Sequence, residues 1–158
     1  LWLIHIFHAI HYFSSHNRIV GRKPKNLSWE QAAAEPLTLL TAWEGLAEGL
    51  AIPFSSTPTN KTILIINGGG GVGTIGIQLA KKRHGLKVIA TASRPETIEL
   101  CKKLGADAVI DHRKPLRDQL KELGHDTVDF ILNCHEADEH WDQLKVGCRY
   151  KSNIELFH

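Results

Sequence analysis

The sequence predicts an α/β fold built on a parallel sheet, and three observations lead to that prediction. Continuous apolar, β-branched runs such as Ile63 to Ile66 are typical of strands buried on both faces. Other segments space their apolar residues as one face of a helix does. The two kinds of segment alternate from Lys61 onward, and parallel strands need such crossover helices between them.

Each element follows from its local pattern. We expect strands at 61–67, 87–92, 107–111 and 127–134. We expect helices from Val72 to Arg83, at 95–104 and around 115–123. Ahead of them, Ser28 and Gln31 form a capping box, and Pro36 is expected to restart a helix that continues to Leu50.

Four consecutive glycines separate the first strand from its helix. Glycine loses more backbone freedom on folding than other residues, so such a run indicates a close approach to the backbone. Gly68, Gly70 and Gly73 fit G-x-G-x-x-G, which allows a tight turn and a pyrophosphate against backbone N–H groups. We therefore predict a Rossmann-like, doubly wound sheet whose pyrophosphate-binding residues are Gly68, Gly70, Gly71, Val72 and Gly73.

The glycine run has three other interpretations. A P-loop would need Lys and then Ser or Thr after the last glycine, but Thr74 follows Gly73 directly. A merely flexible loop and the cofactor loop of a methyltransferase share the glycine turn and stay open as alternatives. The flanking strand and helix favour dinucleotide binding.

The end of the second strand bears on which dinucleotide is bound. An NAD site places Asp or Glu there, but no acid occurs before Glu96. Thr91, Ser93 and Arg94 offer hydroxyls and a guanidinium instead, which suit a 2′-phosphate, so we predict NADPH. In the alternative interpretation Ser93 is a helix cap and Arg94 an ordinary solvated residue.

Composition fits one compact domain and excludes several classes. A chain of 158 residues is the size of a single domain, and its net charge of +2 gives no reason to expect nucleic acid as a partner. Three widely spaced cysteines without a C-x-x-C pair argue against a disulfide framework, so a reducing cytoplasm is expected. No apolar run is long enough to span a membrane, and the apolar start lacks the basic region of a secretory signal.

Several motifs in order resemble those of a known family. These are "RIVGRKPKNLSWEQAAAEPLTLLTAWEGL", "LIINGGGGVGTIGIQLAK", "VIATASRPETIELCKKLGADAVIDH" and "DFILNC". Over about residues 17–143 the chain resembles the medium-chain dehydrogenase/reductase superfamily, close to quinone oxidoreductases and zinc-type alcohol dehydrogenase-like proteins. The resemblance implies an NADPH-dependent oxidoreductase that passes hydride to a quinone or an activated carbonyl or alkene, and a homodimer for the complete protein.

The resemblance also implies further cofactor residues. In the family the helix carrying "PLTLLTAWEGL" packs beside the nicotinamide, so Thr38 and Thr41 are expected on the cofactor side. Asn133 and Cys134 are expected to line the nicotinamide half of the cleft. In the alternative interpretation both threonines bond only their own helix backbone.

No metal ligands and no catalytic residue are predicted. The family's zinc ligands lie in a domain ahead of the cofactor domain, and no such spacing occurs in this chain. His5, His8 and His11 recur at intervals of three and could share a helix face, but no acid or cysteine joins them. No acid or base of the chain is a credible catalytic group.

Both ends depart from the family, so the expected sheet is incomplete at both ends. We divide the chain into an unmatched segment 1–16, a connector and helical region 17–60, a dinucleotide-binding domain 61–143 and an unmatched tail 144–158. The sequence has the character of a fragment or an altered gene product, in which the last strands of the sheet are missing and an edge is left unpaired. The alternative function is an NADP-binding module without turnover.

Overall fold

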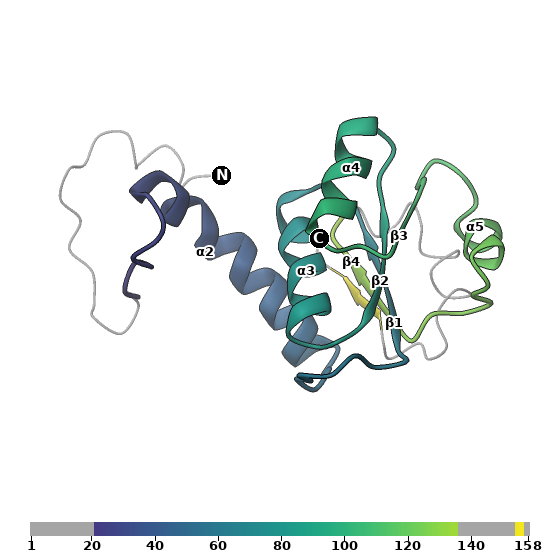
Figure 1. Cartoon of the computed structure of the whole chain (residues 1–158), viewed down its shortest axis with the longest axis horizontal. Coiled ribbons are helices and arrows are strands. Elements are labelled where there is room, and N and C mark those ends of the chain that lie inside the picture. The colour runs from purple at the N-terminus through teal and green to yellow at the C-terminus, as the bar shows by residue number, and fades with distance from the viewer. Residues whose placement is uncertain (1–20, 136–153, 157–158) are drawn as a thin grey trace. The chain divides into compact units, whose positions relative to one another are not determined.

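The structure, a computed structural model, describes residues 21–135 and 154–156 (Figure 1). The histidines at 5, 8 and 11, and the hypothesis that they bind a metal, lie outside the described residues. The chain divides into two compact units, residues 1–34 and residues 35–158.

The capping box predicted at the start of the first described helix, α2 (Trp29–Glu44), is confirmed. The N–H of Ser28 donates to Oε1 of Gln31 (2.9 Å), and the N–H of Gln31 donates to Oγ of Ser28 (3.2 Å). The expectation that Pro36 restarts the helix is wrong, because α2 continues through it. Proline removes the hydrogen bond to the carbonyl oxygen of Ala32 and its ring crowds that oxygen, but the helical residues on both sides of Pro36 keep α2 continuous. A π-helical turn, Gly45–Gly49, follows α2.

The predicted Rossmann-like parallel sheet is confirmed. Its strands lie in the order β3-β2-β1-β4-β5, and every pairing is parallel. The order runs outward from β1 in both directions, so the sheet changes direction between β1 and β4, which is where such folds bind ligands. The strands are β1 (Thr62–Ile66), β2 (Lys87–Thr91), β3 (Ala108–Ile110), β4 (Phe130–Asn133) and β5 (Ile154–Leu156).

Helices lie on both sides of the sheet. Figure 1 shows α3 (Gly71–Lys82) and α4 (Pro95–Leu104) on one side and α5 (Leu116–Glu122) on the other. The apolar run of β1 serves both: Ile63 and Ile65 pack in the core under α3, and Leu64 and Ile66 pack in the core under α5. None of the helices in the described part of the chain is long and apolar enough to cross a membrane.

The expectation of an unpaired edge after the fourth predicted strand is wrong for β4. Residues 154–156 form β5, which pairs with β4 over Ile131↔Ile154, Leu132↔Glu155 and Asn133↔Leu156. Three extended residues are enough for this short pairing. No strand was expected after residue 134 because, beyond about Gln143, the family's next strand and its glycine turn are replaced by an unmatched tail.

Candidate functional site

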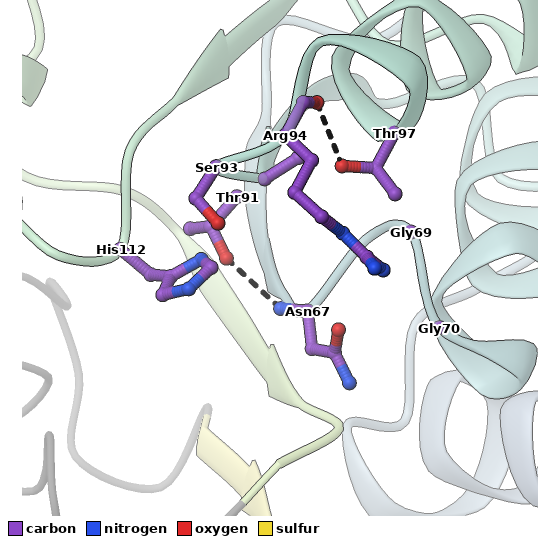
Figure 2. A pocket seen from close by; sticks show the side chains of 9 residues that line it. Asn67, Gly69, Gly70, Thr91, Ser93, Arg94, Thr97 and His112 are labelled. Carbon is purple, nitrogen blue, oxygen red and sulfur yellow. Dashed lines mark hydrogen bonds between the residues drawn. The ribbon is translucent and has the colours of Figure 1, made fainter.

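A cavity of about 300 Å³ opens where the carboxyl ends of β1, β2 and β3 meet. Figure 2 shows its lining, drawn from the glycine turn, the loop after β2, the start of α4 and the loop after β3. The lining residues are Asn67, Gly69, Gly70, Thr91, Ala92, Ser93, Arg94, Thr97 and His112. Predicted site residues from two distant stretches, Gly70 and the pair Ser93 and Arg94, therefore share one cavity.

The glycine turn is fixed to the neighbouring strand by hydrogen bonds. Asn67 begins the turn in the left-handed conformation (φ 57°), which Asn tolerates better than most residues. Its N–H donates to Oγ1 of the buried Thr91 (2.9 Å), and the N–H of Gly68 donates to the carbonyl oxygen of Thr91 (2.9 Å). The N–H of Gly70 donates back to the carbonyl oxygen of Asn67 (3.0 Å). Thr91, predicted only as a hydroxyl for the cofactor, thus holds the turn.

The glycines are required by close packing. A Cβ on Gly68 would lie 2.8 Å from Cβ of Ala90, and one on Gly69 would lie 2.8 Å from Cβ of Thr97. A Cβ on Gly73 would collide with the carbonyl oxygen of Asn67 and lie 2.8 Å from Cα of Gly68. Any larger residue would therefore push the turn away from α3 and the sheet.

The N-terminus of α3 is open to an anion. Its N-cap, Gly70, is extended (φ −80°, ψ 172°) and supplies no side-chain hydrogen bond. The first N–H groups of a helix have no partner within it, and the helix dipole makes this end positive. The predicted residues Gly71 and Val72 lie in this first turn, which has no acidic side chain. The arrangement matches an anion site at a helix N-terminus.

Ser93 and Arg94 form the opposite rim of the cavity. The alternative interpretation of Ser93 as a helix cap is wrong, because Arg94 is the N-cap of α4 and no side chain caps it. The side chain of Thr97, in the first turn of α4, donates from Oγ1 to the carbonyl oxygen of Arg94 (2.9 Å). Figure 2 shows the Arg94 guanidinium extending over the cavity toward Gly69 and Gly70, and the Ser93 hydroxyl turned into it.

His112, in the loop after β3, is a lining residue that sequence analysis missed. The preceding residue, Asp111, is paired with Arg113: the guanidinium donates to Oδ2 of Asp111 (2.8 Å) and holds the pKa of that carboxyl well below its usual range. The same guanidinium donates to the carbonyl oxygen of Ser93 (3.3 Å), which ties this loop to the rim.

The predicted nicotinamide-side residues lie outside this cavity's lining. Both threonines bond their own helix, as the alternative interpretation has it: Oγ1 of Thr38 donates to Glu35 (3.2 Å) and Oγ1 of Thr41 to Leu37 (2.8 Å). Thr38 nevertheless lies against the start of α3, since a Cβ on Gly71 would be 3.0 Å from its Cγ2.

Asn133 ends β4 on the other side of β1. It is fully buried, and its Nδ2 has no hydrogen-bond partner among the described residues. Its neighbour Cys134 accepts a bond from Nδ2 of Asn67 through its carbonyl oxygen (3.4 Å), which links the two strand ends. Burial raises the pKa of the Cys134 thiol to about 12, so it stays protonated and is no nucleophile.

A second cavity, of about 350 Å³, lies at the opposite, amino ends of β1 and β2. The loop 55–60 lines it together with Lys82 and Lys87, and with Lys81, whose Nζ is paired with Asp107 at 2.6 Å. It has no glycine turn and no helix N-terminus.

No metal-binding group is found in the part of the chain that the structure describes, since no three His, Cys, Asp or Glu side chains gather there.

Comparisons with known proteins place these features in context. A family model described as "Zinc-binding dehydrogenase" matches residues 71–150. A zinc-type alcohol dehydrogenase-like protein of Staphylococcus aureus is 43% identical over 127 residues, which are 80% of this chain and 38% of that protein.

Two similar solved structures differ in the cofactor with which they are described. A quinone oxidoreductase from Thermus thermophilus, described with its NADPH complex, has a TM-score of 0.61 and 30% identity over 76% of this chain and 37% of its own. An NAD-dependent alcohol dehydrogenase has a TM-score of 0.71 and 32% identity over 81% of this chain and 36% of its own. The chain thus spans less than two fifths of the length of these proteins.

Proposed function

Since the chain belongs to the medium-chain dehydrogenase/reductase superfamily, we propose that it forms the cofactor-binding part of an NADPH-dependent oxidoreductase. In this proposal the complete protein passes hydride to a quinone or to an activated carbonyl or alkene. The similarity to a quinone oxidoreductase from Thermus thermophilus supports a quinone as the substrate. The similarity to an NAD-dependent alcohol dehydrogenase makes NAD the competing cofactor.

One observation carries the choice of NADPH. A single cavity joins the uncapped N-terminus of α3 to a rim made by Ser93 and Arg94. An NAD site needs a carboxylate to accept the ribose hydroxyls, but the lining of this cavity, all of it within the described residues, contains no Asp or Glu. A guanidinium can instead form two parallel hydrogen bonds to a phosphate.

The cavity and the adjoining first turn of α3 would hold different parts of the cofactor. The N–H groups of Gly71 and Val72 and the positive end of α3 would bind the pyrophosphate, and Arg94 and Ser93 would bind the 2′-phosphate. The bound cofactor supplies the hydride chemistry, while the protein orients it and excludes water. Thr38 and Asn133 would lie toward its nicotinamide half. Nδ2 of Asn133, which has no hydrogen-bond partner in the described part of the chain, would be the donor to that half.

The substrate half of the reaction needs more than these residues. Besides Arg94 and His112, the cavity is lined by no titratable side chain from the described residues, so no catalytic acid or base is assigned. A homodimer and a cytoplasmic location stay predictions. The chain's short span relative to its relatives makes substrate binding a property to test in the complete protein.

The test is a titration of the 158-residue chain with NADPH and with NADH, followed by nicotinamide fluorescence, in the wild type and in Arg94→Gln. Loss of a charged hydrogen bond costs about 1.5–3 kcal/mol, which corresponds to roughly ten- to a hundredfold weaker NADPH binding. NADH binding should change little. Arg117→Gln removes the same charge from the exposed side of α5, away from the cavity lining, and should bind as the wild type does. Equal binding of NADH and NADPH by the wild type would overturn the choice of NADPH.

A further inference from the structure

We propose that His112 is a third ligand of the 2′-phosphate and makes the preference for NADPH over NADH depend on pH. This inference rests on the function proposed above. It adds a residue from a third strand end, and a response to pH, to a site otherwise formed by the glycine turn and the start of α4.

The position of His112 is the first observation. Its Nδ1 is buried and has no hydrogen-bond partner in the described part of the chain. Its side chain lines the same cavity as Ser93 and Arg94, and Figure 2 shows the ring entering from the side opposite Arg94, turned toward Ser93 and Thr91. A buried polar atom without a partner costs free energy, so such an atom beside a cavity indicates a ligand that completes its bonding.

The backbone around His112 is held rigidly on both sides. Gln119 on α5 accepts from the N–H of Asp111 through Oε1 (2.8 Å) and donates to its carbonyl oxygen through Nε2 (2.8 Å). On the other side, Arg113 bonds both the Asp111 carboxylate and the carbonyl oxygen of Ser93. The imidazole is therefore presented to the cavity at low entropic cost, as a preorganised binding group should be.

The charges that face the imidazole decide how it responds to a ligand. They are Arg94 from the start of α4, and Asp111 and Arg113 from its own loop; the lining groups from the glycine turn and β2 are neutral. Asp111 is already neutralised by Arg113 at 2.8 Å. A phosphate dianion bound between Arg94 and the imidazole would favour a proton on the ring. Binding of the 2′-phosphate should thus take up a proton.

Protonation changes the number of bonds that the ring can donate. A neutral imidazole donates from one nitrogen, but a protonated one donates from both and adds a charge. Histidines change charge between about pH 5 and pH 8. NADH lacks the 2′-phosphate, so only NADPH gains from the second cation, and the ratio of the two affinities should rise as the pH falls.

The experiment measures Kd for NADPH and NADH at about pH 6 and about pH 8, a range in which histidine titrates. We expect the NADPH preference of the wild type to rise several-fold from the higher to the lower pH, and the rise to be lost in His112→Gln. His125→Gln, just beyond the turn that follows α5 and away from the cavity lining, is the matched control and should behave as the wild type does. Because the phosphate itself takes up a proton near pH 6, the difference between wild type and His112→Gln, not the wild-type slope alone, reports the histidine.

Proton uptake gives a second readout that needs no variant. Calorimetry near pH 7 in two buffers of different ionisation enthalpy should show uptake of a fraction of a proton with NADPH and less with NADH. A phosphate that binds to cations releases a proton, whereas the histidine takes one up. Net proton uptake on NADPH binding would therefore come from the histidine and not from the phosphate. Failure of the wild type to prefer NADPH at either pH would refute the proposed function. If the wild type prefers NADPH but His112→Gln shows the same pH dependence, this inference alone is refuted. It is also refuted alone if the wild type prefers NADPH but takes up no proton on binding it.

Discussion

Replacement of Gly73 by alanine is the sharpest test of why the turn is built from glycine. Gly73 is buried in the first turn of α3. A Cβ there would collide with the backbone carbonyl oxygen of Asn67 and lie 2.8 Å from Cα of Gly68, so it meets backbone rather than a side chain that can rotate away. The turn itself must therefore move.

The expected size follows from two opposing terms. Overpacking a tight site costs about 1–3 kcal/mol, and more where backbone must shift. Alanine in place of helical glycine recovers roughly 1 kcal/mol. Because Gly73 faces two backbone groups we take the upper end of the cost, and Gly73→Ala should lower the free energy of unfolding by about 2 kcal/mol. The displaced turn should also lose nucleotide binding.

Gly76→Ala is the matched control in the same helix. Gly76 is also buried, but its Cβ would meet side-chain ends that can rotate, Cδ2 of Leu132 at 3.2 Å and Cδ1 of Ile65 at 3.7 Å. Its stability should stay within about 1 kcal/mol of the wild type, since the gain in helix propensity offsets the contact. Urea unfolding followed by circular dichroism measures both variants. Equal stability of Gly73→Ala and Gly76→Ala would refute the argument that backbone contact requires a glycine at position 73.

Two further predictions concern bonds that hold the site's frame. Thr91→Val removes the acceptor of the Asn67 N–H, so it should lower the free energy of unfolding in urea by about 1–3 kcal/mol. The control, Thr62→Val in the neighbouring strand, replaces another buried threonine and should cost less. Equal losses in the two variants would contradict the role of Thr91. Burial raises the pKa of Asp107, but hydrogen bonds from Lys81 and from the Val88 N–H outweigh it and leave the pKa lowered. A carboxyl group with a lowered pKa stabilises the folded state at any pH above its unfolded pKa of about 4. This stabilisation is lost as the pH falls below that value, through the folded pKa. Asp107→Asn should therefore reduce the urea midpoint at neutral pH and weaken its fall in acid, and an unchanged acid profile would count against this.

The sequence predicted most of the fold because its signals are local. The β-branched run of β1 and the helical spacing of α4, whose predicted bounds 95–104 match the structure, depend on residues next to one another. Pro36 shows the limit of such rules. A proline disfavours helix on average, but the residues on both sides of it carry α2 through the position.

The site was predicted less completely because its parts meet only in three dimensions. The glycines and the pair Ser93 and Arg94 can be identified in the sequence by their spacing from a predicted strand. His112 and Asn67 have no comparable sequence motif. His112 is a single histidine after a short strand, and Asn67 lies just outside the glycine motif that it precedes. Asn67 could have been suspected, because Asn is among the few residues that tolerate a left-handed turn after a strand. His112 could be found only from the strand order that places β3 beside β2.

Central to the proposed function is the joint binding of a dinucleotide by the glycine turn and the loop after β2. Amide chemical-shift mapping of the ¹⁵N-labelled chain on addition of NADPH tests it most directly. We expect saturable shifts that are largest at 69–73, Ser93 and Arg94, and small at 55–60, which line the cavity at the opposite end of the strands. Shifts that concentrate at 55–60, or no saturable shift at the glycine turn, would contradict it.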